Sequence, residues 1–339
     1  MKKILLSVTL AFSFFSATSQ VLDSENFSTL TIGNIGTDLT GATPGQGSWL
    51  TFATGGANTD FQVIDGGATQ GNVLQITGSA TTTSTKYFWK DGFADIWGFR
   101  DAGNDILEVE YDFFSGAPTT SKNSMRVLIY DATGTKVLAG ISMAADTKVV
   151  SGLAYYNNAG TPGNYLFGLG ATAATPIVLT ANTWVRMGFS FNLTTGQVNW
   201  KGPGFNGFVM GAAAAVAPNE IDTVVATTTG NTASSIGLFD NYIIKAAATV
   251  DLLAVNQATA TNVFSVYPNP ATNVINVQNT GSAGITGVTM TDLNGRVVKQ
   301  STFEAVSNTQ ININDLSSGV YMMKISSNEG STIKKIIKN

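Results

Sequence analysis

The sequence has 339 residues, a formal net charge of −4, and neither cysteine nor histidine. Disulfides, thiol nucleophiles, His-dependent triads and His-ligated metals are therefore excluded, which leaves carboxylate, lysine or tyrosine chemistry and oxygen-liganded cations such as calcium. A chain of this length predicts two folded units.

The N-terminus has the pattern of a secretory signal peptide. Two lysines precede a short apolar stretch, Ile4–Phe15, which is too short to span a bilayer. The small residues Ala17 and Ser19 predict cleavage before Gln20. We expect residues 1–19 to be removed and the mature chain to be exported without a transmembrane segment.

Residues 20–245 predict an all-β passenger domain. Short β-branched and aromatic runs alternate with Gly, Asn, Asp and Thr punctuation, and helical periodicity is nearly absent. The pattern favours a β-sandwich, and we expect residues 202–211 to form a turn or loop. The predicted strands are 48–53, 73–78, 85–91, 105–114, 124–132, 136–143, 152–157, 164–170, 183–192, 197–202, 221–227 and 236–246.

An aromatic-rich segment, "KYFWKDGFADIWGFR", is the first candidate ligand site. Carbohydrate sites need flat aromatic faces for the C–H side of a sugar and a few polar groups for its hydroxyls. Tyr87, Trp89, Asp91 and Trp97 are the candidate ligand-binding residues. The alternative is that these aromatic side chains pack in the core or between sheets.

The segment "EVEYD" puts three carboxylates, Glu108, Glu110 and Asp112, at alternate positions of a predicted strand. Laminarinase-type glycosidases use such an acidic strand, and the segment resembles it with two departures, Glu110 for the middle aspartate and Asp112 for the acid/base glutamate. The resemblance implies Glu108 and Asp112 as the catalytic pair. The main interpretation is instead a solvated acidic face opposite an apolar one, with contact to calcium or a sugar as a further alternative.

The late strands of the passenger carry a second resemblance. "TWVRMGFSFNLTTGQVNWKG" and "IGLFDNYIIKA" resemble the last strands of concanavalin-like jelly rolls, with a Trp-containing strand, a Gly turn and a final strand with an internal aspartate. The resemblance implies a jelly-roll sandwich. Its members include sugar-binding modules, adhesion modules and glycosidases, so function stays open.

The two ends of the passenger suggest a calcium site. Jelly-roll modules often connect their first and last strands through calcium, and Glu25 and Asp240 occupy those two ends. Carboxylate oxygens are suitable ligands for this ion, which could stabilise a secreted fold that has no disulfides. We expect no other cofactor.

Residues 246–262 lose both aromatic residues and alternation, which predicts a linker. Seven short strands then predict a small second sandwich of the immunoglobulin-like type in residues 263–339, with a tight turn at Asn294 and Gly295. The predicted strands are 263–268, 273–278, 287–292, 296–303, 309–314, 319–326 and 331–338.

The motifs of this tail, "YPNPATNVINV", "MTDLNGRVV" and "DLSSGVYMMKISSNEGSTIKKIIKN", resemble the C-terminal sorting domain of the type IX secretion system of Bacteroidota. The resemblance implies passage through the periplasm, export across the outer membrane, secretion or attachment at the outer cell surface, and often removal of the tail. The residues that match the family motifs are Tyr267, Pro268, Asn269, Pro270, Gly295, Arg296, Gly319, Tyr321, Lys334 and Lys335.

The net charge of the passenger argues against some classes of ligand. Residues 21–262 contain 10 Lys or Arg and 18 Asp or Glu, a net charge of −8, which does not fit nucleic acid. The first interpretation is a non-catalytic binding or adhesion protein of the cell surface, with glycans as the candidate ligand. Two alternatives stay open: a glycoside hydrolase or polysaccharide lyase of similar architecture, and a structural protein of the surface or matrix.

Overall fold

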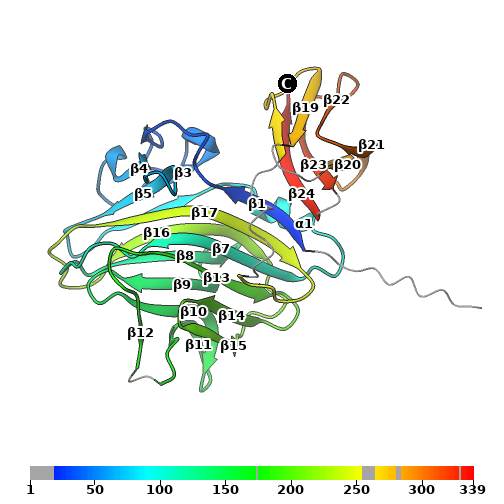
Figure 1. Cartoon of the computed structure of the whole chain (residues 1–339). Helices are drawn as coiled ribbons and strands as arrows, with labels where there is room; N and C mark the ends of the chain where they lie inside the picture. The colour runs from blue at the N-terminus through cyan, green and yellow to red at the C-terminus, as the bar shows by residue number, and fades with distance from the viewer. Residues whose placement is uncertain (1–18, 173–174, 254–263, 280–283, 328–329) are drawn as a thin grey trace, which may run out of the picture.

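The computed structural model describes residues 19–172, 175–253, 264–279, 284–327 and 330–339. Two β-rich units follow one another along the chain (Figure 1). The larger unit, the passenger, contains strands β1 to β17, and the smaller, C-terminal unit contains β18 to β24. The expected signal peptide lies outside the described residues except for Ser19.

The passenger is a sandwich of two antiparallel sheets (Figure 1). The first sheet has the strand order β15 (Phe205–Met210), β14 (Gln197–Gly202), β13 (Trp184–Asn192), β7 (Ile106–Phe114), β17 (Ser235–Ala247) and β1 (Gln20–Glu25), with β5 (Asn72–Gly78), β4 (Phe61–Asp65) and β2 (Gly33–Asn34) continuing from part of β17. The second sheet has the order β11 (Thr161–Gly168), β10 (Val149–Asn158), β9 (Val137–Ala144), β8 (Asn123–Asp131), β16 (Pro218–Thr227), β6 (Thr85–Trp89) and β3 (Leu50–Ala53), with β12 (Ile177–Val178) beside β10.

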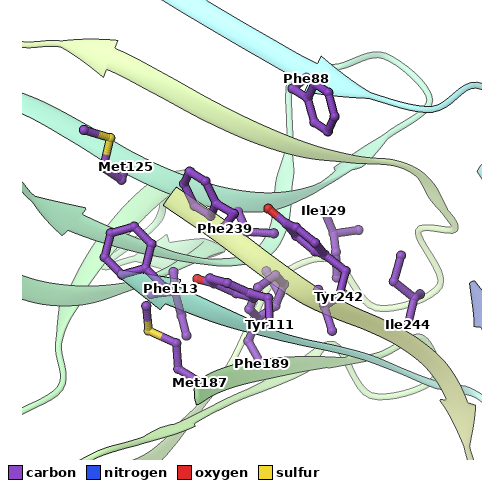
Figure 2. Close-up of a cluster of buried hydrophobic side chains, with 14 of the residues drawn as sticks. Phe88, Tyr111, Phe113, Met125, Ile129, Met187, Phe189, Phe239, Tyr242 and Ile244 are labelled. Atoms are coloured by element: carbon purple, nitrogen blue, oxygen red, sulfur yellow. The ribbon is translucent and has the colours of Figure 1, made fainter. Parts of the chain in front are cut away.

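The main core lies between the two sheets. Because successive side chains of a strand point to opposite faces, β7 sends Val109, Tyr111 and Phe113 into this core, as its alternation predicts. Met125 and Ile129 of β8 meet them from the other sheet. Figure 2 shows these two side chains together with Tyr111, Phe113, Phe239 and Tyr242. All these side chains are nearly inaccessible to solvent. The fold is thus the all-β sandwich of the jelly-roll type that the sequence predicts.

A tryptophan ties the two sheets together at one end of the core. The Trp200 indole nitrogen of β14 donates a hydrogen bond to the Gly140 carbonyl of β9 at 2.7 Å. Its ring lies against Gly152 of β10, where an added Cβ would come within 2.4 Å of the ring. Only glycine fits this position without displacing the indole.

All twelve predicted passenger strands are present, but several elements were not expected. These are strands β1, β2, β4, β12 and β15, the short helix α1 (Phe93–Gly98), and two 3₁₀ turns, η1 (Gln46–Ser48) and η2 (Asn58–Asp60). The segment 202–211 does not form a simple turn, because most of it is β15, paired with β14. The aromatic segment after β6 contains α1, which buries Phe93 and Trp97.

The C-terminal unit contains the seven strands that the sequence predicts. One small sheet has the order β18 (Phe264–Tyr267), β19 (Val274–Asn279) and β22 (Asn308–Asn312). The other strands are β21 (Val297–Val306), β20 (Ile285–Asp292), β23 (Gly319–Ser327) and β24 (Gly330–Lys338), in that spatial order. A separate apolar cluster that includes Ile275, Val288 and Ile325 fills the space between them. The unit is the small immunoglobulin-like sandwich that was expected.

Candidate functional site

The acidic strand does not present a solvated face. Glu108 is 0% exposed and Glu110 is 3% exposed, so this expectation was wrong for both residues. The buried Lys245 ammonium of β17 lies 3.0 Å from Glu108 Oε2 and 2.8 Å from Glu110 Oε1. The two carboxylates therefore flank one buried cation, whose charge offsets part of the cost of removing them from water.

The chain that leaves β17 covers this network. The segment 248–253, which we call the strap, crosses the acidic strand and buries Leu252. The Asp251 backbone amide donates to Glu108, and the Leu253 amide donates to Glu110 at 3.0 Å. Residues 246 and 247 of the expected linker belong to β17, and residues 254–262 lie outside the described residues.

These contacts set the protonation of the acidic strand. Burial alone would raise the pKa of Glu110, but Lys245, the Leu253 amide and Arg186 together hold it below the usual value. Burial raises the pKa of Glu108, and Lys245 and the Asp251 amide offset this only in part. The groups that shift the pKa values of Glu108 and Glu110 are thus side chains and backbone amides of this chain.

Asp112 also has an ion pair and a hydrogen bond within the chain. Arg186 of β13 contacts Asp112 Oδ1 at 3.0 Å and Glu110 Oε2 at 3.2 Å, and the Asn241 side-chain amide donates to Asp112 Oδ2 at 2.8 Å. The candidate catalytic pair, Glu108 and Asp112, therefore consists of one buried and one half-buried carboxylate, each held by a cation. These contacts do not support the catalytic interpretation of the pair.

The two proposed calcium ligands lie on paired strands. Glu25 is opposite Tyr242 in the β1–β17 ladder, and its carboxylate accepts from Trp49 Nε1 at 3.1 Å and from Lys90 Nζ at 3.3 Å. Asp240 is fully buried, and this burial raises its pKa to about 7, to which Asp112 and Glu25 contribute. Among the described residues, no group of three or more acidic side chains lies close enough to hold a metal ion.

A different arrangement is found on the second sheet. Since Met125, Val127 and Ile129 of β8 point into the main core, the alternating Arg126 and Tyr130 point to the outer face. The same alternation places further polar side chains of β16 and β6 on this face. We call this set the Asp222 cluster; it consists of Tyr87, Arg126, Tyr130, Glu220 and Asp222.

Strand register brings the members of the Asp222 cluster together. Glu220 lies opposite Tyr130, and Asp222 lies opposite Leu128 on β8. Arg126 and Tyr87 flank Val224 from the two neighbouring strands. Around them, Leu128, Val137, Leu153, Val224 and Ala226 form a small apolar cluster on the outer face, against which Tyr87 and Tyr130 pack.

Asp222 is the least satisfied member of the cluster. Its side chain is 3% exposed, and its Oδ1 atom has no hydrogen-bond partner. Burial, and next the adjacent Glu220 carboxyl, raise the pKa of Asp222 to about 9. At neutral pH the Asp222 carboxyl is therefore protonated, and it shares a hydrogen bond with the Glu220 carboxyl, so that Oδ1 is the atom left without one.

The other members keep polar groups next to this carboxyl. Burial raises the pKa values of Tyr87 and Tyr130, and each hydroxyl interacts electrostatically with Asp222 and Arg126. Arg126 donates from Nε to Ser124 Oγ at 2.9 Å, and burial lowers the pKa of its guanidinium. Donors, acceptors and flat rings thus gather on the outer face of the second sheet, where most of them are half-buried.

The candidate ligand residues of the aromatic segment separate into two groups. Tyr87 belongs to the Asp222 cluster, Trp89 follows it on the same face of β6, and Asp91 accepts a hydrogen bond from Trp89 Nε1 at 3.1 Å and interacts with Glu220. Trp97 lies in the main core at 3% exposure, with the Arg100 guanidinium over its ring. Its ring is therefore packed inside the protein, as the alternative interpretation expected.

Sequence reasoning missed Arg126, Tyr130, Glu220 and Asp222. The available signal was polar residues at alternate positions of two strands that are otherwise apolar, "SMRVLIYD" and "EIDTVV". Both segments, except for Glu220, were predicted as strands without any function for these side chains.

The sorting motifs meet at the last strand of the C-terminal unit. The Asn269 side chain accepts from the Ile337 amide and donates to the Lys335 carbonyl, each at 2.8 Å, so it pairs with β24 as a backbone would. Gly295 and Arg296 form the β20–β21 turn, where Asp292 accepts three hydrogen bonds from Asn294 and Arg296.

The remaining sorting residues flank the same region. Gly319 has a φ angle of +155° at the start of β23, and the Tyr321 hydroxyl donates to the Ser317 carbonyl at 2.8 Å. Tyr267, Pro268 and Pro270 surround Asn269 at the end of β18. Lys334 and Lys335 follow one another on β24.

Residues 265–339 match the family model described as "Secretion system C-terminal sorting domain". The C-terminal unit is therefore a sorting domain of the type IX secretion system, as its motifs predict, and the chain is secreted or displayed at the outer cell surface. Within the described part of the chain, no helix is long and apolar enough to cross a membrane.

A sequence search among curated proteins finds no match. Three solved structures are similar to this chain at low scores. The first is "alginate lyase vAL-1 from Chlorella virus", with 10% identity, a TM-score of 0.39, and coverage of 64% of this chain and 99% of that chain. The second is "Cellulose induced protein, Cip1", with 13% identity, a TM-score of 0.38, and coverage of 63% of this chain and 97% of that chain. The third is Bacillus licheniformis beta-glucanase, with 10% identity, a TM-score of 0.38, and coverage of 62% of this chain and 97% of that chain. At such TM-scores the likeness does not indicate what this chain binds.

Proposed function

We propose that the passenger is a carbohydrate-binding protein without catalytic activity, which acts outside the cell and binds a glycan through the Asp222 cluster. The observation that supports this most directly is the buried, protonated carboxyl of Asp222, whose Oδ1 lacks a partner on an outer sheet face. A buried polar atom without a partner costs about 1–3 kcal/mol. Because Asp222 Oδ1 is inaccessible to solvent, we expect a glycan to contact the half-buried side chains around it, Tyr87, Tyr130 and Glu220, and not this atom directly.

The surroundings of Asp222 fit a sugar better than a peptide or a nucleic acid. The Tyr87 and Tyr130 rings offer apolar surface with a polar end, and the rings of Phe52 and Tyr87 lie 6.1 Å apart on the same face. Arg126 and Glu220 supply further donors and acceptors for hydroxyl groups. Flat rings beside a few polar groups form the usual combination in sugar sites.

The experiment is binding of the purified full chain to an array of neutral and acidic polysaccharides. We expect at least one glycan to bind, and Tyr87→Ala and Asp222→Ala to weaken that binding by at least about tenfold, or about 1.4 kcal/mol. The control is Tyr156→Ala, because Tyr156 lies on the opposite face of the same sheet, beside Tyr165 and Phe167. Equal loss in the control, or no loss in the other two variants, would contradict the proposal.

Polysaccharide cleavage is a second candidate function of the same cluster. The observation that favours it is the pairing of a protonated carboxyl, Asp222, with a second carboxyl whose pKa burial also raises, Glu220, beside two tyrosines. Carboxyl groups with separated pKa values can act as acid and base. Release of reducing ends or of unsaturated products from a bound glycan, lost in Asp222→Asn, would favour the enzyme over the binding protein.

A further inference from the structure

The sorting domain is attached to the passenger through a pair of strands. The start of β24 lies beside β1, the first strand of the passenger, and continues the first sheet into the C-terminal unit (Figure 1). The pairing is parallel and short, with Gln20 opposite Ser331 and Val21 opposite Thr332. On its other side β1 pairs with β17 over most of its length.

Side chains of the sorting domain also enter the passenger core. Met322 of β23 and Ile333 of β24 are 1% and 3% exposed, and both belong to the main core cluster of the passenger. The sorting domain has its own core, which contains the neighbouring Met323 and Ile336 instead. Alternate residues of these two strands thus serve different domains, which makes the contact a packed interface.

Charges complete this interface. Lys324 of β23 forms an ion pair with Asp101, which follows α1 in the passenger. Lys334, one of the sorting residues, interacts with the Asp23 and Glu25 carboxylates of β1, close to the Lys90 ammonium. Lys335 beside it is exposed. One of the two adjacent sorting lysines therefore lies within electrostatic range of the passenger.

We propose that the β1–β24 junction opens when the export machinery binds the sorting domain. In the closed state, the first strand of the passenger covers the edge of β24 and lies beside Lys334. The proposal concerns the sorting domain and is independent of the Asp222 cluster. Two residue pairs form the ladder, so strand exchange at this edge breaks few hydrogen bonds. The machinery would replace β1 with an edge of its own that carries acidic side chains, since Lys334 faces Asp23 and Glu25 in the closed state.

A disulfide lock tests the junction, and the chain is suited to it because it contains no native cysteine. Val21 and Thr332 are directly opposed residues of neighbouring strands, which places their Cα atoms within disulfide range. We expect Val21→Cys/Thr332→Cys to form the disulfide in the purified full chain. The mismatched pair Val21→Cys/Thr302→Cys, with its second cysteine on the far strand β21, should form none.

Secretion is the second readout. In the producing cells we expect the locked double variant to accumulate inside the envelope, and added reductant to restore its secretion to the level of each single variant. Absence of the disulfide in the purified chain would show that the junction does not form. Secretion of the locked chain at the level of the single variants would show that the junction need not open.

A charge reversal tests the junction without any cysteine. In the full chain, Asp101→Lys should speed hydrogen exchange of the β1 and β24 amides by at least about tenfold, because local opening then becomes easier. The compensated variant Asp101→Lys/Lys324→Asp should return the exchange rates toward those of the unaltered chain. Unchanged exchange in the single variant would overturn the assignment of a releasable interface.

Discussion

The two outer faces of the passenger sandwich both carry acidic residues at alternate strand positions, but they treat these residues differently. On the first sheet, Glu108 and Glu110 share the Lys245 ammonium and are covered by the strap. On the second sheet, Asp222 is as deeply buried, yet one of its oxygens has no partner. The number of carboxylates is thus a poor guide to function, and what they contact decides it.

The comparison also shows two ways to bury an acid. A cation and backbone amides keep Glu110 ionised, with a lowered pKa. No cation contributes to lowering the pKa of Asp222, so burial and Glu220 raise it and the carboxyl keeps its proton. In the first arrangement a lysine and two backbone amides of the chain contact the carboxylates, whereas in the second Asp222 Oδ1 has neither a cation nor a hydrogen-bond donor beside it.

The largest expected effect comes from removing the shared cation. Lys245→Ala leaves the buried Glu108 without a counter-ion and Glu110 with Arg186 alone, so the free energy of unfolding should fall by about 3–5 kcal/mol in urea denaturation. The control is the exposed Lys122→Ala, which should change stability by less than about 0.5 kcal/mol. A similar, small loss in both variants would mean that the first face is not a stabilising network.

A smaller effect is expected on the second face, and it depends on pH. The Asp222 carboxyl has a folded-state pKa near 9 and an ordinary value of 3.8, so the folded chain holds one more proton between these limits. The free energy of unfolding should therefore fall as pH rises from 4 to 9, by no more than about 1.4 kcal/mol over any one pH unit, which is less than the loss expected for Lys245→Ala. Asp222→Asn, which cannot ionise, should remove this part of the slope and be more stable than the unaltered chain at pH 9.

The control for that measurement is Asp95→Asn, which changes an exposed aspartate of α1. We expect its stability to follow the pH curve of the unaltered chain. Parallel curves for all three proteins, measured by urea denaturation at several pH values, would show that Asp222 is solvated like any surface carboxylate.

The smallest expected effect concerns calcium at Glu25 and Asp240. Lys90 already balances Glu25, and Asp240 is largely protonated below its pKa of about 7, so little charge remains for a cation at mildly acidic pH. We expect a chelator to lower the melting temperature by less than about 2 °C, which corresponds to a fraction of 1 kcal/mol for a domain of this size. A clearly larger drop would establish the pair as a calcium site.

Most strands could be predicted because alternation is a local property of the sequence. The runs 105–114 and 183–192 alternate clearly, and they became β7 and β13. The strand β1 has the mixed sequence "QVLDSE" and is specified by its two neighbours, β17 and β24, which lie far along the chain. Pairing with strands that lie far along the chain cannot be predicted from a short stretch of sequence.

The candidate site was harder to predict for the same reason. Glu108 stood out in the sequence because acidic residues surround it, but its partner Lys245 lies more than a hundred residues away. Asp222 has only one charged neighbour in its strand, Glu220, and only strand register brings it near Tyr87 and Tyr130. Tyr87 was found because it belongs to an aromatic run.

The strap has a practical meaning for anyone who shortens or fuses this protein. Composition alone would end the passenger near residue 245, before the two amides that reach Glu108 and Glu110. A boundary there would open two carboxylates to water and strip Leu252 from their surface. Reporter fusions and expression fragments should therefore keep every residue through Leu253, since the last stretch of what looks like spacer completes the sheet it leaves.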